Sequence, residues 1–160
     1  MSPSNKPRPE AVTTAKWWAD VLRKFVVELQ PTAQLSPEDV PPGRGSQNRR
    51  DYIKQAKEAV KVLTPERIAR FQQRLAESVE LSMWASRDSS CAISQPEPKD
   101  YRNDEVIQSA LQEAGIDPFL FGGKSIFPRS LTTIVQPGRV MVIDYGGDRD
   151  GLSYLEIVNE

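Results

Sequence analysis

The apolar positions in the first half of the chain have the spacing of α-helices. Over 14–29, 48–63 and 65–82 they recur every three or four residues, which places them along one side of a helix. Thr64 and Pro65 separate the second and third segments, because threonine is a favoured N-cap and proline fits the first helical turn. The expected inward stripes are Trp17, Val21, Leu22, Phe25 and Leu29, then Ile53, Ala56, Val60 and Leu63, then Ile68, Phe71, Leu75 and Val79. The pattern predicts three amphipathic helices, with the last two forming an antiparallel or sharply angled hairpin.

The second half of the chain changes to a pattern typical of strands. After a fourth predicted helix over 104–114, with Asn103 as its N-cap, three β-branched segments occur at 131–135, 140–145 and 152–158. Glycine-containing turns separate these segments, and residues 91–93 are a further short candidate strand. The prediction is an α+β fold, in which a helical N-terminal half of about four helices packs on a small C-terminal antiparallel β-meander.

The length and the proline distribution indicate how this fold is organised along the chain. A chain of 160 residues fits one domain with its own core. Residues 1–10 are polar and proline-rich, and we expect a disordered lead there, followed by a single domain over 11–160. A proline-rich linker is expected at 30–47, within which 36–39 fits a single helical turn and plain disorder equally well.

Composition excludes several classes of chemistry. The chain has no histidine, which rules out His-dependent catalytic triads and most zinc sites. Cys91 is the only cysteine, so no internal disulfide forms. The sequence shows no signal-peptide h-region and no apolar run of about 18 residues. We therefore expect a cytoplasmic protein with no cofactor, no membrane partner and no enzymatic activity; the oligomeric state is left open.

Charge is distributed unevenly, although the net charge is only −1. Residues 1–81 contain 14 basic and 10 acidic residues, whereas residues 82–160 contain 7 basic and 12 acidic residues. Seven cations fall at helical spacing on the second and third predicted helices: Arg50, Lys54, Lys57, Lys61, Arg67, Arg70 and Arg74. Clustered Lys and Arg bind phosphates and carboxylates, but such a stripe is more often a solvated helix face. This stripe is the candidate partner-binding surface.

An aspartate-rich turn near the C-terminus is the candidate metal site. Asp144, Asp148 and Asp150 lie among glycines, and carboxylates on such a loop can supply oxygen ligands to calcium or magnesium. The turn lacks the EF-hand spacing, and Gly-Gly and Asp-Gly are also the residues that a hairpin turn requires. A hairpin turn is therefore favoured over a metal site, and a metal-assisted hydrolase is kept as an alternative function.

Trp17 and Trp18 are adjacent near the start of the first predicted helix. Neighbouring positions on a helix point in different directions, so only one of the two indoles easily faces the same core. Burial of both between helix and sheet is the favoured interpretation. In the alternative, one indole packs in the core and the other lies at a partner surface.

Part of the chain resembles a group of small actinobacterial and phage proteins that have no assigned activity. The similarity covers Trp17-Trp18-Ala19-Asp20-Val21-Leu22-Arg23, then residues 105–115, then Phe127-Pro128 through the Pro137-Gly138 turn to Tyr145-Gly146. Arg129 stands where the group has tryptophan. The resemblance implies a phage or mobile-element accessory protein, a setting in which inhibitors of host defence complexes are common.

Three functions are therefore kept open. The leading expectation is a non-enzymatic interaction protein that inhibits a host defence complex, for example as an anti-CRISPR protein, by meeting an acidic protein or nucleoprotein surface with its basic helical face. Direct nucleic-acid binding by the same face is the second. The metal-assisted hydrolase is the third.

Overall fold

The computed structural model describes residues 6–95, 103–120, 126–127, 130–144 and 153–158. The elements in order are α1 (Pro9–Ala33), the 3-10 turn η1 (Pro37–Asp39), α2 (Ser46–Val62), α3 (Pro65–Ala85), β1 (Cys91–Gln95), α4 (Glu105–Glu113), β2 (Leu131–Gln136), β3 (Arg139–Asp144) and β4 (Ser153–Val158). Four helices and an antiparallel sheet confirm the α+β prediction. Among the described helices, none is long and apolar enough to cross a bilayer.

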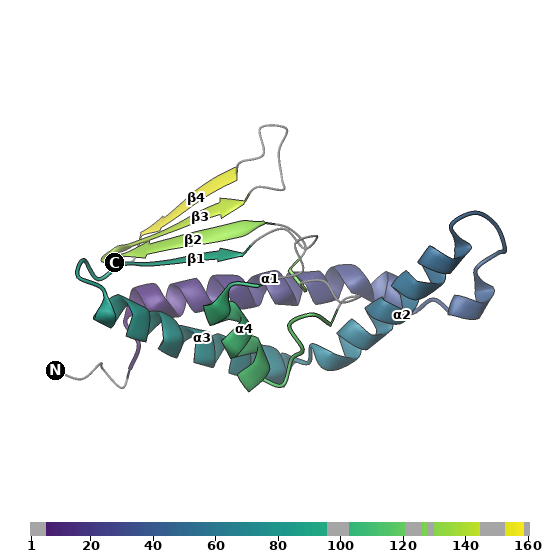
Figure 1. The fold of residues 1–160 in the computed structure, drawn as a ribbon, viewed down its shortest axis with the longest axis horizontal. Helices are drawn as coiled ribbons and strands as arrows, with labels where there is room; N and C mark the ends of the chain where they lie inside the picture. Colours follow the sequence, from purple (N-terminus) through teal and green to yellow (C-terminus); the bar gives the residue numbers. More distant parts are fainter. Residues whose placement is uncertain (1–5, 96–102, 121–125, 128–129, 145–152, 159–160) are drawn as a thin grey trace.

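The long helix α1 is the axis on which the other elements pack. Its N-terminal half lies between α3 and the sheet, and its C-terminal half lies along α2 (Figure 1). A helix between two layers must bury more than one stripe, and α1 fully buries Ala11, Trp18 and Leu22. Val21 and Phe25, expected in a single inward stripe, are only partly buried against this core.

The expected hairpin of the second and third helices is wrong. The helices α2 and α3 do not pack side by side; they follow each other back along α1, and each packs on α1 (Figure 1). Each of them contacts a different half of the 25-residue α1, α3 the N-terminal half and α2 the C-terminal half. The break itself is confirmed at the expected position, because Thr64 caps α3 by accepting a hydrogen bond from the backbone N–H of Arg67 at 3.2 Å.

The first helix is longer than predicted at both ends. It begins at Pro9, inside the segment expected to be a disordered lead, and it continues through Pro31 to Ala33, inside the expected linker. Proline in the last turn removes only one helical hydrogen bond, and Leu29 and Ala33 still pack into the core. In the segment where a helical turn and disorder fitted equally well, the chain forms η1.

The sheet has four strands in the order β1-β2-β3-β4, so the short candidate strand at 91–93 is part of it. Strand β1 pairs with β2, placing Cys91 opposite Val135, and β2 places Val135 opposite Val140 of β3. Alternation along β2 directs Leu131, Thr133 and Val135 into the core. The sheet therefore has one face packed over the start of α1 (Figure 1).

Trp18 joins α1 to the sheet. Its side chain is fully buried, its indole Nε1–H donates to Thr133 Oγ1 at 3.0 Å, and Phe127 packs edge-on against it. Trp17 also forms an edge-to-face pair with Trp18 and is only half-buried. The favoured expectation of two buried indoles is therefore correct for Trp18 alone, because the second indole points to the margin of the core.

The N-cap of α4 is Asp104 and not the expected Asn103. The Asp104 carboxylate accepts from the backbone N–H groups of Val106 and Ile107. Asn103 instead accepts from the buried Gln95 side chain at 2.7 Å and donates to the Pro118 carbonyl at 3.2 Å. The Asn103 side chain therefore bonds to Gln95 of β1, and the next residue, Asp104, caps the helix.

Candidate partner-binding surface

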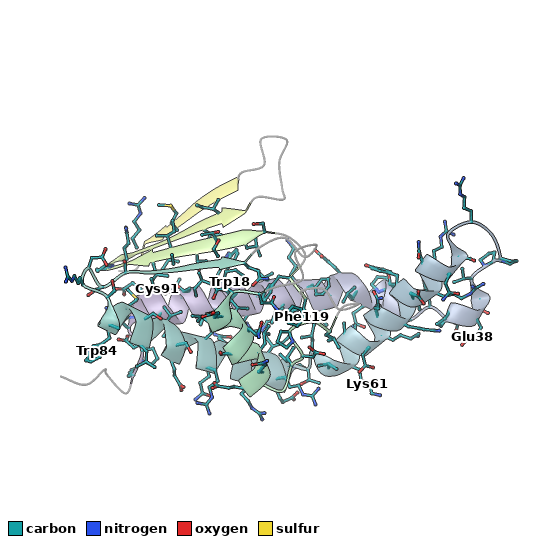
Figure 2. The ribbon with its side chains drawn as sticks, viewed as in Figure 1. Trp18, Glu38, Lys61, Trp84, Cys91 and Phe119 are labelled. Carbon is teal, nitrogen blue, oxygen red and sulfur yellow. The ribbon has the colours of Figure 1, made fainter. Side chains whose placement is uncertain are left out.

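The basic stripe on α2 lies beside the face that packs on α1. Ile53, Ala56 and Ala59 are buried, and Arg50 with the residues four, seven and eleven positions after it lies along a different face of the helix. Three members of the stripe on α2 are solvent-exposed: Lys54, Lys57 and Lys61. Figure 2 shows Lys61 on the side of α2 away from α1. The structure therefore supports the helix-face arrangement expected from the spacing.

Two members of the α2 stripe also make local hydrogen bonds. Lys57 Nζ donates to the Ala33 carbonyl at 2.6 Å, at the end of α1, where cations complement the exposed carbonyls of a helix terminus. Arg50 is half-buried, and its guanidinium donates to the Gln47 side chain at 3.4 Å. Neither contact involves an acidic group, so both positive charges remain unneutralised by a described carboxylate.

The continuation of the stripe on α3 is partly occupied by structural contacts. Arg67 is half-buried and donates to the Val62 carbonyl at 3.0 Å, which caps the end of α2. Arg74 pairs with Glu77 at 3.3 Å and with Glu113 of α4 at 3.7 Å. Arg70 lies between them, exposed. The sequence did not reveal the contact with Glu113, because that residue lies 39 positions away and reaches Arg74 only through the packing of α4 on α3.

Three exposed cations of the surface therefore have neither a hydrogen bond nor an ion pair to the described part of the chain: Lys54, Lys61 and Arg70. Uncompensated charges at a surface act over about one Debye length, roughly 8 Å at physiological salt. These three residues are the part of the surface most available to an acidic partner.

The residues proposed for metal binding lie mostly outside the described part of the chain. Asp148 and Asp150 are not described, and Asp144 ends β3 at the position paired with Ser153. Within the described residues, no three His, Cys, Asp or Glu side chains come close enough to hold an ion. The metal site stays a prediction from the sequence.

Cys91, the one thiol of the chain, is half-buried at the start of β1. Burial is the main cause that raises the pKa of its thiol above the ordinary value, and a nearby Asp104 charge acts in the same direction. A raised pKa keeps sulfur in the neutral thiol form, which is a poor nucleophile. The environment of Cys91 therefore suits packing better than covalent catalysis.

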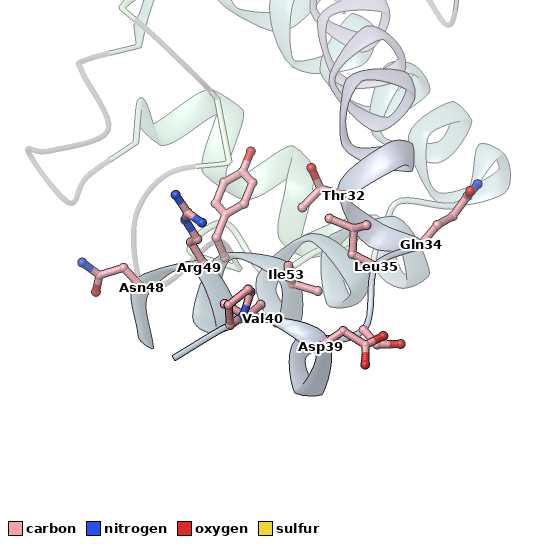
Figure 3. A pocket seen from close by; sticks show the side chains of 11 residues that line it. Thr32, Gln34, Leu35, Asp39, Val40, Asn48, Arg49 and Ile53 are labelled. Carbon is pink, nitrogen blue, oxygen red and sulfur yellow. The ribbon is translucent and has the colours of Figure 1, made fainter. Parts of the chain in front are cut away.

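A cavity that the sequence did not indicate lies at the end of the molecule farthest from the sheet. Residues of the last turn of α1, of η1 and of the first turns of α2 line this open cavity (Figure 3), and its volume is about 680 Å³. The prolines of residues 30–47 predict a linker, and a linker gives no indication of packing on α2.

Comparison with known proteins supplies no relative: no family model, no curated protein and no solved structure matches this chain.

Proposed function

We propose that the chain is a non-enzymatic interaction protein, and that the basic face of α2 and α3 meets an acidic surface on a protein or nucleoprotein partner. The observation that carries this proposal is the exposure of Lys54, Lys61 and Arg70 without a described carboxylate partner. Uncompensated charge of one sign accelerates association with a surface of the opposite sign and makes the rate dependent on salt.

The position of α2 supports this use. It lies at one end of an elongated molecule, away from the sheet, and of the described elements only α1 and η1 pack extensively on it (Figure 1). A partner can therefore approach its outer side without meeting the sheet. Inhibition of a host defence complex, such as a CRISPR effector, in a phage or mobile-element setting is proposed from the family resemblance alone.

The test is affinity capture from the native host with three baits. These are the natural sequence, the double variant Lys54→Glu/Lys61→Glu, and the control Lys24→Glu/Arg87→Glu, which changes two exposed cations elsewhere by the same charge. We expect a partner bound by the first and third baits to be lost or strongly reduced with the second. Its association rate should fall with added salt for the natural sequence and fall less steeply for the stripe variant. Equal capture by all three baits would refute the basic surface.

Nucleic-acid binding by the same face is the second candidate, favoured by the spacing of uncompensated cations along two consecutive helices. Fluorescence anisotropy with labelled single- and double-stranded oligonucleotides tests it over about 50 to 300 mM salt. The logarithm of affinity should fall linearly with the logarithm of salt, and Lys54→Glu/Lys61→Glu should reduce the slope by about 2, since each phosphate contact contributes roughly 0.9. Absence of binding at the lowest salt would dispose of this candidate.

A further inference from the structure

The cavity at the end of α1 has the dimensions and lining of a binding pocket. Its apolar walls include Leu35, Val40, Tyr52 and Ile53, and at about 680 Å³ it falls within the usual range of roughly 300–1,000 Å³ for ligand pockets. Leu35 is 54% exposed and Tyr52 is 45% exposed. Two exposed apolar side chains beside one cavity form an apolar patch that a partner can cover.

The α2 side of this pocket is positively charged. Arg49 lines it there, is exposed and has no ion pair with a described carboxylate, whereas Asp39 lines the pocket from η1 (Figure 3). Arg50 and Lys54 follow Arg49 along α2, so the pocket and the basic stripe belong to the same helix. A guanidinium binds a carboxylate through two parallel hydrogen bonds. The complementary ligand is therefore apolar at its centre and carries a carboxylate on the side that meets α2.

The walls of the pocket are formed by the chain's own local structure. Backbone hydrogen bonds from Asp39 to Ser36 and from Val40 to Pro37 close η1. Pro41, in the wall after η1, has a fixed φ, and Gly45 turns the chain into α2 at a φ of 81°, in the left-handed region that favours glycine. A pocket formed in advance loses little conformational entropy on binding, which raises affinity for a given contact area.

We propose that this pocket takes a bulky apolar side chain from an acidic segment of a partner protein. The apolar side chain inserts between Leu35, Tyr52 and Ile53, and flanking carboxylates pair with Arg49 and the basic stripe. The inference rests on the proposed function and deepens it, because it names the chemistry of the partner that the basic surface receives. The arrangement is that of an interface with a central apolar anchor and a charged rim.

The test is a selection from a random library of displayed peptides against the immobilised full chain. Enriched peptides should contain Leu, Phe or Trp next to Asp or Glu. Binding of the synthesised peptides is then measured to Leu35→Glu and to Val27→Glu, the latter a 70% exposed apolar position that does not line the cavity. Leu35→Glu should weaken binding by about tenfold or more, and Val27→Glu should leave it unchanged. Thermal unfolding of both variants near the midpoint of the natural sequence shows that the fold is intact.

The outcomes separate the pocket from the basic surface. The pocket inference is overturned if no peptide is enriched, or if the peptides bind Leu35→Glu as tightly as the natural sequence. In that case, loss of the captured partner by Lys54→Glu/Lys61→Glu would still support the basic surface. If Lys54→Glu/Lys61→Glu and a peptide with glutamine in place of its acids both bind unchanged, the basic surface fails and the pocket remains as a purely apolar site. A dimer in light scattering that Leu35→Glu abolishes would assign the pocket to a second copy of the chain and overturn the partner proposed.

Discussion

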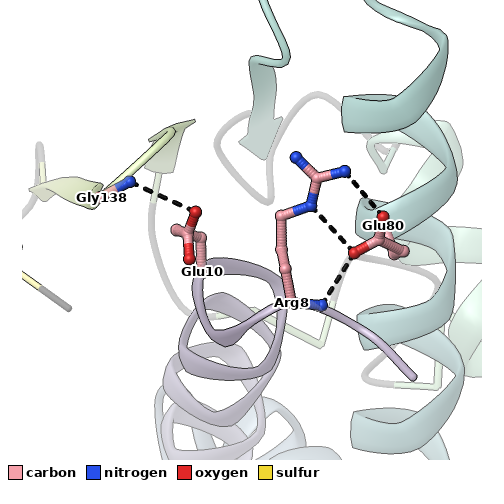
Figure 4. Close-up of polar contacts among 4 residues, drawn as sticks. All are labelled: Arg8, Glu10, Glu80 and Gly138. Atoms are coloured by element: carbon pink, nitrogen blue, oxygen red, sulfur yellow. Dashed lines mark hydrogen bonds and ion pairs between the residues drawn. The ribbon is translucent and has the colours of Figure 1, made fainter. Parts of the chain in front are cut away.

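At the scale of single residues, the most buried charged contact joins the segment before α1 to α3. Glu80 is 4% exposed, and its carboxylate accepts from Arg8 Nε at 2.9 Å, from Arg8 Nη2 at 2.8 Å and from the Arg8 backbone N–H at 2.8 Å (Figure 4). Two residues further on, the Glu10 carboxylate accepts from the Gly138 N–H at 3.2 Å, at the turn between β2 and β3. The start of α1 is therefore held to both of its neighbouring layers.

Replacing Glu80 with glutamine should lower the free energy of unfolding by about 1–3 kcal/mol at neutral pH. The amide NH2 cannot accept one of the three hydrogen bonds, and the other two lose the charge of their acceptor. Urea denaturation at equilibrium measures this difference. The matched control is Glu77→Gln on the same helix, where the exposed pair with Arg74 contributes less than about 1 kcal/mol. Equal losses of unfolding free energy at the two positions would show that the Arg8–Glu80 contact stabilises the fold no more than an exposed ion pair does.

The same pair predicts a dependence on pH. The Arg8 hydrogen bonds are the largest cause that lowers the pKa of the Glu80 carboxyl below its ordinary value of 4.5, despite the opposing effect of burial. A depressed pKa stabilises the fold above 4.5, and that contribution is lost as the pH falls through the lower folded-state pKa. The difference between the natural sequence and Glu80→Gln should therefore be complete at pH 5 and above and shrink as the medium becomes more acidic. A difference that stayed constant down to about pH 3 would contradict the assignment.

At the scale of elements, the sequence predicted each helix and strand better than it predicted their packing. Periodicity and the Thr64 cap were sufficient to locate α2 and α3, because both signals are local in the chain. The hairpin failed because a helix with one apolar stripe can pack on any apolar neighbour, and α1 proved longer than its prolines suggested. The basic stripe could be predicted from spacing. The pocket could not, since its two sides come from a segment whose prolines indicated a linker and from the first turns of α2.

The cap of α4 is an element whose stability depends on a distant strand. Besides capping Val106 and Ile107, the Asp104 carboxylate accepts from the backbone N–H of Ser94 on β1 at 3.2 Å. Asp104→Ala should therefore reduce the free energy of unfolding by about 2 kcal/mol, the upper end of the range for cap removal, and Thr64→Ala, which removes a cap alone, by about 1 kcal/mol. Chemical denaturation of both variants makes the comparison. Asp104→Asn keeps one acceptor oxygen for the cap but places a donor NH2 where the Ser94 N–H needs an acceptor, so it should recover only about half of the loss. An Asp104→Ala effect no larger than that of Thr64→Ala would show that the bond to β1 adds no stability.

At the scale of the whole molecule, the two ends of α1 have different surroundings. The N-terminal end is covered by α3 on one side and by the sheet on the other, with Trp18 and Phe127 between them. The C-terminal end packs on α2 (Figure 1). Burial against a single neighbour stabilises an element less than burial between two layers, so the proposed binding end is also the end with less tertiary support.

This difference predicts the order of local opening. By native-state hydrogen exchange, amides in the second half of α2 should exchange roughly 10- to 100-fold faster than buried amides of α3, since α2 can detach from α1 without opening the core beneath the sheet. The matched variants are Ala59→Gly in α2 and Ala76→Gly in α3, both at buried positions, where glycine costs about 1 kcal/mol in a helix interior. Ala59→Gly should accelerate exchange in α2 alone, whereas Ala76→Gly should accelerate every amide that exchanges through global unfolding. If Ala59→Gly accelerated all amides equally, α2 and the core would open as one unit.

In that case a ligand in the pocket between α1 and α2 would stabilise the whole chain and not one end of it. The same exchange measurement with a bound peptide distinguishes the two cases, because the peptide slows exchange either in α2 alone or in all amides.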